Sequence, residues 1–198
     1  MGFSLTMGFF RSWLQPTMNR RTLICVLTGF ASGMPYYLLF QLVPAWLRTS
    51  EVSLLEIGLF SLAGLPYTWK FLWAPFLDRW ELPLGLRRSW MLLTQIALIG
   101  CIGSLGHLDP KRDLSLIGIV AVGVAFLSAT QDIAIDAYRR ELLPDAELGL
   151  GNAIHIQAYR IASLVPGSLA LVLADNLPWK FVFWGTALFM VAGVTLSV

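Results

Sequence analysis

Long apolar runs are the feature that most constrains how this chain can fold. Six such runs occur, over residues 22–47, 54–77, 90–107, 114–137, 149–174 and 179–198. A run of about 17 to 25 apolar residues is long enough to cross the hydrocarbon core of a bilayer as a helix. The polar joints between the runs are short and leave no room for a soluble domain. We therefore expect an all-α integral membrane protein, with a six-helix transmembrane bundle over residues 22–198 and a cytoplasmic N-terminal segment over residues 1–21.

The composition excludes several classes of protein. Hydrophobic residues make up 57% of the 198 residues and charged residues only 13%, which is outside the usual range of soluble domains. The formal net charge of +2 is small and the basic residues are dispersed, so no nucleic-acid partner is expected. Cys25 and Cys101 both lie within apolar runs, where packing is the simplest role, so neither a disulfide framework nor a metal site is expected.

The distribution of Lys and Arg between the joints predicts the orientation. Eight lie in the N-terminal segment and in the second and fourth joints: Arg11, Arg20, Arg21, Arg79, Arg87, Arg88, Arg139 and Arg140. Four lie in the other three joints: Arg48, Lys111, Arg112 and Lys180. Because basic residues near membrane spans favour the cytoplasmic side, we expect the N-terminus in the cytoplasm.

Two of the 14 basic residues, Lys70 and Arg160, lie inside spans. Counted along straight helices, these two residues and the acidic Asp132 lie roughly 12 to 16 Å from the cytoplasmic surface. Charges at that depth are costly unless they are paired or hydrated, and they mark candidate functional sites. We expect the two cations and the one anion to face the bundle interior, to satisfy each other and to leave a net positive site. The alternative is a structural ion pair between Lys70 and Asp132 that only fixes the helix register.

A second acid, Asp136, shares a helical face with Asp132 because the two are four residues apart. Its place nearer the end of the span associates it with Arg139 and Arg140, so we assign it to a cytoplasmic gate. The alternative for both acids is helix capping and simple pairing with these arginines.

The fifth run is unusually polar for a membrane span. Besides Arg160 it contains Asn152, His155, Gln157 and Tyr159, and so polar a span seldom faces lipid. His155 is a secondary candidate for proton coupling because imidazole titrates near neutral pH, although a buried neutral histidine is the commoner case.

Aromatic residues and helix breakers also lie within the spans. Four aromatic side chains could stack on a sugar, although packing is the simpler role: Tyr36, Tyr37, Tyr67 and Trp69. Glycine and proline in the first, second and fifth spans allow close helix crossing and local opening: Gly29, Gly33, Pro35, Gly58, Gly64, Pro66, Pro75, Gly149, Gly151, Pro166 and Gly167.

Strings in and near the joints resemble those of a known transporter family. The residues Asp78-Arg79-Trp80, followed by Gly85-Leu86-Arg87-Arg88, resemble the signature G-x-x-x-D-R-x-G-R-R of major facilitator transporters. Here Ala74 replaces the leading glycine, and four extra residues precede the next one. Together with GFASGMP at 29–35, KFLWAPFLDRW at 70–80 and SATQDIAIDAYRRELLP at 128–144, they closely resemble the N-terminal half of the AmpG family of anhydromuropeptide permeases.

The resemblance, which covers residues 9–198, implies a fold and a function. Such permeases have twelve or more helices in two six-helix halves and alternate between inward-open and outward-open states. They use the proton gradient, without a cofactor, to import anhydromuropeptides (GlcNAc-anhydroMurNAc-peptides) across the inner membrane for cell-wall recycling. This import also feeds the signal that induces β-lactamase. The residues that match the family's strings position by position are Lys70, Asp78, Arg79, Gln131, Asp132, Asp136 and Arg160, and Tyr138 and Arg139 follow its pattern.

The predicted site then has three parts. The substrate-binding candidates are Lys70, Arg160, Gln131 and Tyr159. The proton-coupling candidates are Asp132 and His155. The candidates for the cytoplasmic gate are Asp78, Arg79, Arg87, Arg88, Asp136, Arg139 and Arg140.

Alternatives remain for the cargo and for the assembly. A related carrier of another anion, such as acetyl-coenzyme A, fits the same signature. A membrane-embedded enzyme is a minor alternative, because Asp132, Asp136 and Arg139 only partly match the D-G-x-x-A-R motif of phosphatidyltransferases. Since alternating access needs two bundles, we expect a fragment of a longer permease, or else a half-size protein that pairs with a second copy.

Overall fold

The described part of the chain is entirely helical. The computed structural model describes residues 19–79 and 85–197, with side chains up to Val191, and it has no strand within these ranges. The all-α class is therefore confirmed for this part of the chain. Most of the expected N-terminal segment (1–18) and part of the second joint (80–84) lie outside the described residues.

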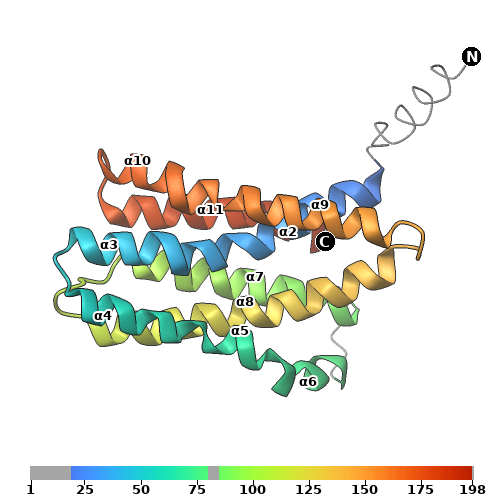
Figure 1. Cartoon of the computed structure of the whole chain (residues 1–198), viewed down its shortest axis with the longest axis horizontal. Helices are drawn as coiled ribbons and strands as arrows, with labels where there is room; N and C mark the ends of the chain where they lie inside the picture. The colour runs from blue at the N-terminus through green and yellow to red at the C-terminus, as the bar shows by residue number, and fades with distance from the viewer. Residues whose placement is uncertain (1–18, 80–84, 198) are drawn as a thin grey trace, which may run out of the picture.

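The helices lie side by side along one long axis (Figure 1). Several runs are divided into consecutive helical pieces. In chain order the pieces are α2 (Arg20–Tyr37), η1 (Leu38–Leu42), α3 (Val43–Thr49), α4 (Leu54–Leu59), η2 (Phe60–Gly64), α5 (Leu65–Trp69), η3 (Lys70–Leu72), α6 (Ala74–Arg79), α7 (Leu86–Leu105), α8 (Leu114–Leu142), α9 (Leu148–Ala162), η4 (Val165–Leu169), α10 (Ala170–Ala174) and α11 (Trp179–Ser197).

Four helical segments among the described residues are long and apolar enough to cross a membrane. They are Arg20–Thr49, Leu86–Leu105, Leu114–Leu142 and Leu148–Ala174, which agree with four of the six expected spans. The expected second span is broken, because 3₁₀ turns at η2 and η3 separate the short helices α4, α5 and α6. The last expected span is the helix α11, whose part with described side chains, Trp179–Val191, is apolar.

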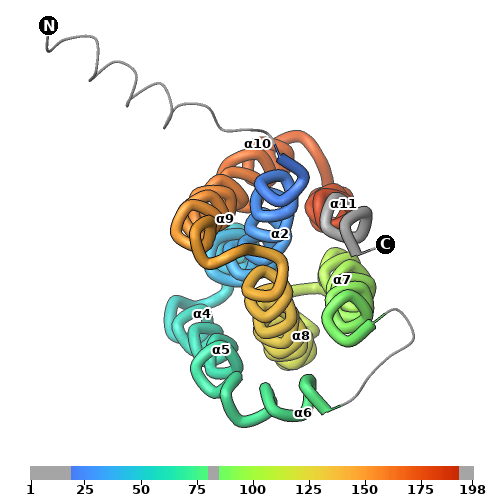
Figure 2. Tube along the Cα trace, turned by 90° about the vertical axis from the view of Figure 1, so that its right-hand side faces the viewer, coloured from blue at the N-terminus to red at the C-terminus, as the bar shows by residue number. Residues whose placement is uncertain are grey.

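The chain reverses direction at each joint, so the joints gather at two ends of the bundle (Figure 1). The start of α2, the end of α6 and the α8–α9 joint lie at one end, which we call the arginine-rich end. The α3–α4, α7–α8 and α10–α11 joints lie at the other. Viewed along the axis, α2 and α8 lie between α9 on one side and α7 with α11 on the other, while α4 to α6 curve around α8 (Figure 2).

The closest packing between neighbouring helices is that of α2 on α9. A Cβ atom at Gly29 would lie 2.3 Å from the carbonyl oxygen of His155, and one at Gly33 would lie 2.4 Å from the carbonyl oxygen of Tyr159. Small residues at the i and i+4 positions allow two membrane helices to approach backbone to backbone, where van der Waals contact holds them together. This contact fixes the polar residues of α9 relative to those of α2.

The apolar core lies on the opposite side of α2, against α7, α8 and α11. Trp46 and Phe183 are almost completely buried there, with ring centroids 4.9 Å apart and planes at 69°. Such an edge-to-face contact is favourable because it sets the positive edge of one ring against the negative face of the other. The core therefore holds α3 against α11, and it extends to Ala162 at the end of α9 and to η4 and α10.

Two single-turn π-helices face each other within the bundle. Pro35 lies shortly before η1, and Pro166 lies within η4. Each proline lacks the backbone N–H that would donate a hydrogen bond in a helix. The side-chain oxygen of Gln41 approaches Gly167 so closely that a Cβ atom there would lie 2.1 Å away. Each π-turn marks a local change of helix register.

Candidate functional site

A polar cavity of about 420 Å³ opens between α2, α8 and α9. It is lined by side chains from the polar faces of these three helices: Ser32, Tyr37, Asp132, Asp136, Arg139, His155, Ile156, Tyr159 and Arg160. The close contact of α2 with α9 places the lining residues of these two helices next to each other. We refer to it as the central cavity.

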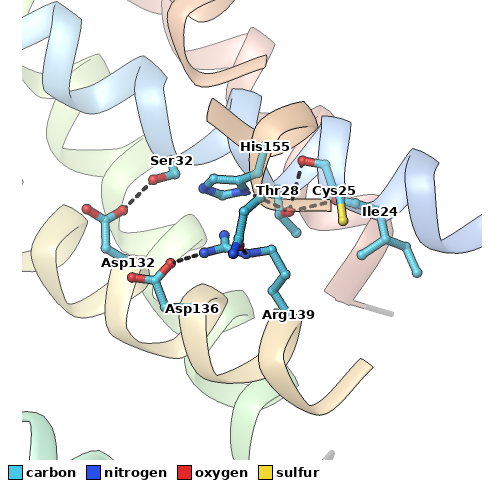
Figure 3. Close-up of polar contacts among 9 residues, drawn as sticks. Ile24, Cys25, Thr28, Ser32, Asp132, Asp136, Arg139 and His155 are labelled. Atoms are coloured by element: carbon cyan, nitrogen blue, oxygen red, sulfur yellow. Dashed lines mark hydrogen bonds and ion pairs between the residues drawn. The ribbon is translucent and has the colours of Figure 1, made fainter. Parts of the chain in front are cut away.

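Asp132 is held by a hydroxyl group from the neighbouring helix. Ser32 Oγ donates a hydrogen bond to Oδ1 of Asp132 over 2.5 Å, and both side chains project into the space between α2 and α8 (Figure 3). Ser32 is buried and Asp132 is partly buried. A charge-assisted hydrogen bond of this kind supports the ionised carboxylate, whereas burial opposes it.

Asp136 and Arg139 form an ion pair on the same face of α8. Nη2 of Arg139 donates to Oδ1 of Asp136 over 2.8 Å, and Nε donates to Oδ1 of Asn152 on α9 over 2.9 Å (Figure 3). The third nitrogen, Nη1, is buried and has no hydrogen-bond acceptor among the described residues. Buried guanidinium donors are normally satisfied, so this unpaired donor marks Arg139, which lines the central cavity, as a candidate ligand for an anion.

His155 lies beside Asp136 and Arg139 but faces α2. Its Nδ1 atom is 3.5 Å from Oγ1 of Thr28, which itself donates to the carbonyl oxygen of Ile24 over 2.7 Å. The imidazole is buried. The structure thus places His155 at the α2–α9 contact, between helix packing and the cavity wall.

The structure separates Lys70 from the other charges predicted to share its layer. Asp132 and Arg160 line the same cavity, whereas Lys70 does not line it. Lys70 lies within electrostatic range of Asp132, but within the described ranges no ion pair shorter than 4.0 Å joins them. The prediction that these charges would pair directly is therefore wrong. The depth count assumed straight α-helices, and the 3₁₀ turns η2 and η3 change both rise and rotation before Lys70 is reached.

Asp132 and Asp136 are not separated into two sites as expected. Both line the central cavity. Their spacing of one helical turn keeps them on one face, and that face is turned toward α2 and α9 along its whole length. Arg139, expected at the gate, also lines the cavity.

Aromatic rings form a cluster at the inner end of the central cavity. The cluster contains Tyr36, Tyr37, Phe40, Tyr67 and Tyr159, with neighbouring ring centroids 4.7 to 6.5 Å apart. Tyr37 and Tyr159 also line the cavity, so their rings reach both the cluster and the cavity. Trp69, by contrast, is 53% exposed on the outside of the bundle.

Gln131 lies on another face of α8 and does not line the central cavity. It is 1% exposed and donates to Oε1 of Gln95, whose own amide donates to the carbonyl oxygen of Met190 over 2.5 Å. These bonds connect α8, α7 and α11. Gln131 therefore contacts α7 and is not among the residues that line the central cavity.

The remaining gate candidates form separate contacts at the arginine-rich end. Arg87 joins Asp78 at the end of α6 to Glu141 at the end of α8, with 3.0 Å between Nε and the Glu141 carboxylate. Arg140 pairs with Asp145 over 2.8 Å. Arg88 lies over the ring of Tyr138, and Arg79 is exposed. Arg87 is thus the centre of a link between three helices.

Sequence reasoning missed several partners of these groups. Ser32, Asn152 and Glu141 each complete a contact described above. Asn152 was visible as a polar residue in an apolar run, one turn before another polar residue. Ser32 and Glu141 carried no such signal, because serine is common in membrane helices and Glu141 lies in a charged joint.

The arrangement suits reversible capture of an anion. With both acids ionised, the two carboxylates of the central cavity balance Arg139 and Arg160. Protonation of either acid would leave a net positive cavity with an unsatisfied donor on Arg139. Within the described residues no group of three or more His, Cys, Asp or Glu side chains is placed to hold a metal ion.

Comparison with known proteins places this arrangement among transporters. The family described as acetyl-coenzyme A transporter 1 matches residues 22–161, more than half of the chain. The chain belongs to this transporter family. The matched region contains the residues of the central cavity, from Ser32 to Arg160.

Similar proteins confirm the resemblance to AmpG. A protein of Haemophilus influenzae that carries no functional name is 52% identical over 181 residues, 91% of this chain and 43% of that protein. The anhydromuropeptide permease of Escherichia coli K12 is 43% identical over 178 residues, 89% of this chain and 35% of the permease. Putative transporter AmpG 1 of Rickettsia typhi is 33% identical over 174 residues, 84% of this chain and 39% of that protein. The chain thus spans only about two fifths of the length of these relatives.

Proposed function

We propose that this chain forms one half of a proton-coupled secondary transporter that imports anhydromuropeptides across the inner membrane for cell-wall recycling. The observation that carries the proposal is the unsatisfied, buried Nη1 of Arg139 in a cavity that also holds Arg160 and two carboxylates. The name of the Escherichia coli relative supports the cargo.

The proposed half is a six-helix bundle with its N-terminus in the cytoplasm. The alternation of the joints between two ends supports this topology, because α4 to α6 together run from one end of the bundle to the other (Figure 1). The partner is either a second six-helix half, as the length of the relatives suggests, or a second copy of this chain. In both cases the two bundles would enclose the substrate between them.

The substrate would meet two kinds of side chain. Its peptide carboxylates would be bound by Arg139 and Arg160, since guanidinium groups bind carboxylates in two-pronged geometry. Its sugar rings would lie on Tyr37 and Tyr159, whose rings line the cavity. Lys70 would contribute at longer range, and Gln131 would act through helix packing.

Proton coupling would follow from the charge balance of the central cavity. Protonation of Asp132 would remove one negative charge and favour an anionic substrate, and release of the substrate would favour loss of the proton. Ser32 would keep the carboxyl group in place in both states. His155 is the second candidate, because its protonation would have the same effect on the net charge.

The gate would lie at the arginine-rich end. The link from Arg87 to Asp78 and Glu141 would hold α6, α7 and α8 together when this end is closed. Arg79, Arg88 and Arg140 would contribute through contacts with the other half or with lipid. Asp136 and Arg139 would connect the gate to the cavity.

Uptake by proteoliposomes tests the proposal. The chain, alone and together with the second half of a relative, is reconstituted and given radiolabelled GlcNAc-anhydroMurNAc-tripeptide with and without an inward proton gradient. We expect gradient-dependent accumulation and its loss with the Arg139→Gln substitution. Accumulation that ignores the gradient would contradict proton coupling, and absence of tripeptide binding to the chain reconstituted with the second half would contradict the cargo.

A second candidate cargo is acetyl-coenzyme A, which is favoured by the family description. Its phosphates would be bound by the same two arginines. Competition separates the two: excess acetyl-coenzyme A should leave muropeptide binding unchanged if the first proposal holds. Displacement at equal or lower concentration would favour the second.

A further inference from the structure

A second basic cavity lies at the arginine-rich end, apart from the central cavity. It has a volume of about 460 Å³ and lies between the first turns of α2 and α7 and the last turns of α8. Its lining contains three arginines and four uncharged residues: Asn19, Arg20, Arg21, Ile24, Arg88, Tyr138 and Leu142. We call it the interfacial cavity.

The positive charge of the interfacial cavity is only partly balanced. Arg21 is 3.3 Å from the carboxylate of Glu147, with both side chains more than two fifths exposed. In the described ranges Arg20 and Arg88 have no carboxylate within 4.0 Å. The nearby acids Asp78, Glu141 and Asp145 are already paired with other arginines. The cavity therefore has an excess positive charge that its own walls do not neutralise.

The cavity also has an apolar side. Ile24 and Leu142 line it, and the guanidinium of Arg88 lies 6.0 Å from the centre of the Tyr138 ring. A cation over an aromatic face is attracted by the ring and is held with its donors directed outward. The pairing gives Arg88 a defined position instead of a freely solvated one.

The position of the cavity matches the headgroup level of a bilayer. Arg20 opens α2 and Arg88 lies in the first turn of α7, and both helices are long and apolar enough to span. The ends of spanning helices lie at the boundary between hydrocarbon and headgroups. The unpaired amides of the two helix starts add to the positive potential there.

We propose that the interfacial cavity binds the phosphate of an anionic phospholipid headgroup. Arg20 and Arg88 hold the phosphate oxygens, Arg21 contributes when it is not paired with Glu147, and Ile24 and Leu142 contact the upper part of an acyl chain. Basic pockets between membrane helices are suited to such headgroups because they combine charge with a lipid-accessible entrance. A soluble phosphate has the same charge but gains nothing from the apolar side.

Native mass spectrometry of the purified chain, with defined lipids added, tests this proposal. The wild-type chain is titrated with dioleoylphosphatidylglycerol, with dioleoylphosphatidylcholine, and with soluble glycerol 3-phosphate. We expect one phosphatidylglycerol bound more tightly than the rest, and weaker binding of the zwitterionic lipid. The double variant R20Q/R88Q should lose roughly thirtyfold in affinity for phosphatidylglycerol, since each arginine near the surface contributes about a factor of five.

Two further variants control for general effects of charge and folding. R48Q/R112Q removes two arginines from the opposite end of the bundle and should leave the affinity unchanged. R20K/R88K keeps the charge and should retain most of the binding, and circular dichroism shows whether each variant remains folded. An equal loss in R48Q/R112Q and R20Q/R88Q would overturn the proposal, because it would reduce the effect to net charge. Glycerol 3-phosphate binding as tightly as the lipid would also overturn it, in favour of a soluble anion.

Discussion

Asp132 and Asp136 are one helical turn apart, yet their contacts give them different chemistry. Asp136 is neutralised by an arginine on its own helix, whereas Asp132 is bound by the neutral Ser32. Protonation of Asp132 would break no ion pair, whereas protonation of Asp136 would weaken its pairing with Arg139. This difference selects Asp132 as the residue that would exchange a proton.

We therefore expect the D132N variant to lose gradient-driven accumulation of muropeptide while it keeps exchange of labelled for unlabelled substrate. The amide preserves the shape of the side chain and mimics the protonated state. Uptake and exchange in the same proteoliposomes provide the measurement. Normal accumulation by D132N would remove the proton role, and a loss of both activities would indicate a structural role instead.

Arg160 and Lys70 are the two cations that the sequence places inside expected spans. Since Arg160 lines the central cavity and Lys70 does not, R160Q should weaken binding of an anionic muropeptide by about tenfold or more, the cost of one charge-assisted hydrogen bond. K70Q should change it by less than about threefold, since it acts only at long range. Equilibrium dialysis with labelled tripeptide measures both constants. A larger effect from K70Q would restore the direct contact that the sequence suggested.

Glu51 and Lys111 form an exposed pair at the end opposite the arginines, outside the spans. Lys111 Nζ donates to Glu51 over 2.8 Å, and this hydrogen bond, with the attraction between the charges, lowers the pKa of Glu51 and raises that of Lys111. The contribution of Glu51 to stability is complete above its ordinary carboxyl pKa and is lost as the pH falls through its lower, folded value. The contribution of Lys111 is complete below its ordinary pKa and is lost as the pH rises through its higher, folded value.

The K111M variant should return the pKa of Glu51 to the usual range of a glutamate. Carbon-13 NMR of labelled glutamate carboxyl groups measures this shift, with the K180M variant as a control at the same end. An unchanged Glu51 titration in K111M would mean that the pair does not persist in solution.

At the level of the helix, the contact of α2 with α9 determines the shape of the central cavity. The G29A variant should lower the free energy of unfolding by about 1 to 3 kcal/mol, because the added methyl group meets the backbone of His155. The control is G100A, where an added Cβ has no atom within 4 Å, and it should be neutral or slightly stabilising. Denaturant titration followed by circular dichroism measures both. A stable G29A would show that the two helices can separate at little cost.

The sequence was sufficient to locate most helices, but it did not show toward which neighbour the side chains of some helices point. The length of the apolar runs located α7 and α8, because a helix buried in lipid needs a continuous apolar run regardless of which helices pack against it. It could not show that residues 54–79 break into α-helical and 3₁₀ pieces, because Gly58, Gly64, Pro66 and Pro75 permit a break without requiring one. The predicted orientation of Lys70 assumed a regular α-helix over this segment and therefore failed. Asp132 and Arg160 lie on regular α-helices, and both line one cavity.

At the scale of the whole molecule, the gathering of arginines at one end makes the orientation testable. Single-cysteine variants S50C and D145C, made in a chain whose Cys25 and Cys101 are replaced by alanine, report the two ends. A membrane-impermeant thiol reagent applied to intact spheroplasts should label S50C at once and D145C only after permeabilisation. The reverse pattern would invert the proposed topology, and equal labelling would contradict an odd number of crossings between the two joints.

Contacts at the arginine-rich end and in the membrane were predictable to different degrees. A charged joint indicates that its residues form ion pairs but does not identify their partners. The link from Arg87 to Glu141 was therefore found only in the structure. Inside the membrane few polar groups exist, and each has few alternatives. This scarcity is why the residues of the central cavity could be largely anticipated from a single sequence.

The π-turn at η1 has a consequence for how the first spanning segment is aligned with its relatives. A π-turn accommodates one extra residue, so the side chains that follow it are rotated by about 100° relative to an uninterrupted α-helix. Trp46 follows that offset and is buried in the core. Removal of one residue between 38 and 42 would return the segment to a regular helix and turn Trp46 away from Phe183. Insertions and deletions at this place would therefore change the packing of α3. The residues of Arg20–Thr49 that lie before η1 and those that lie after it need separate helical wheels.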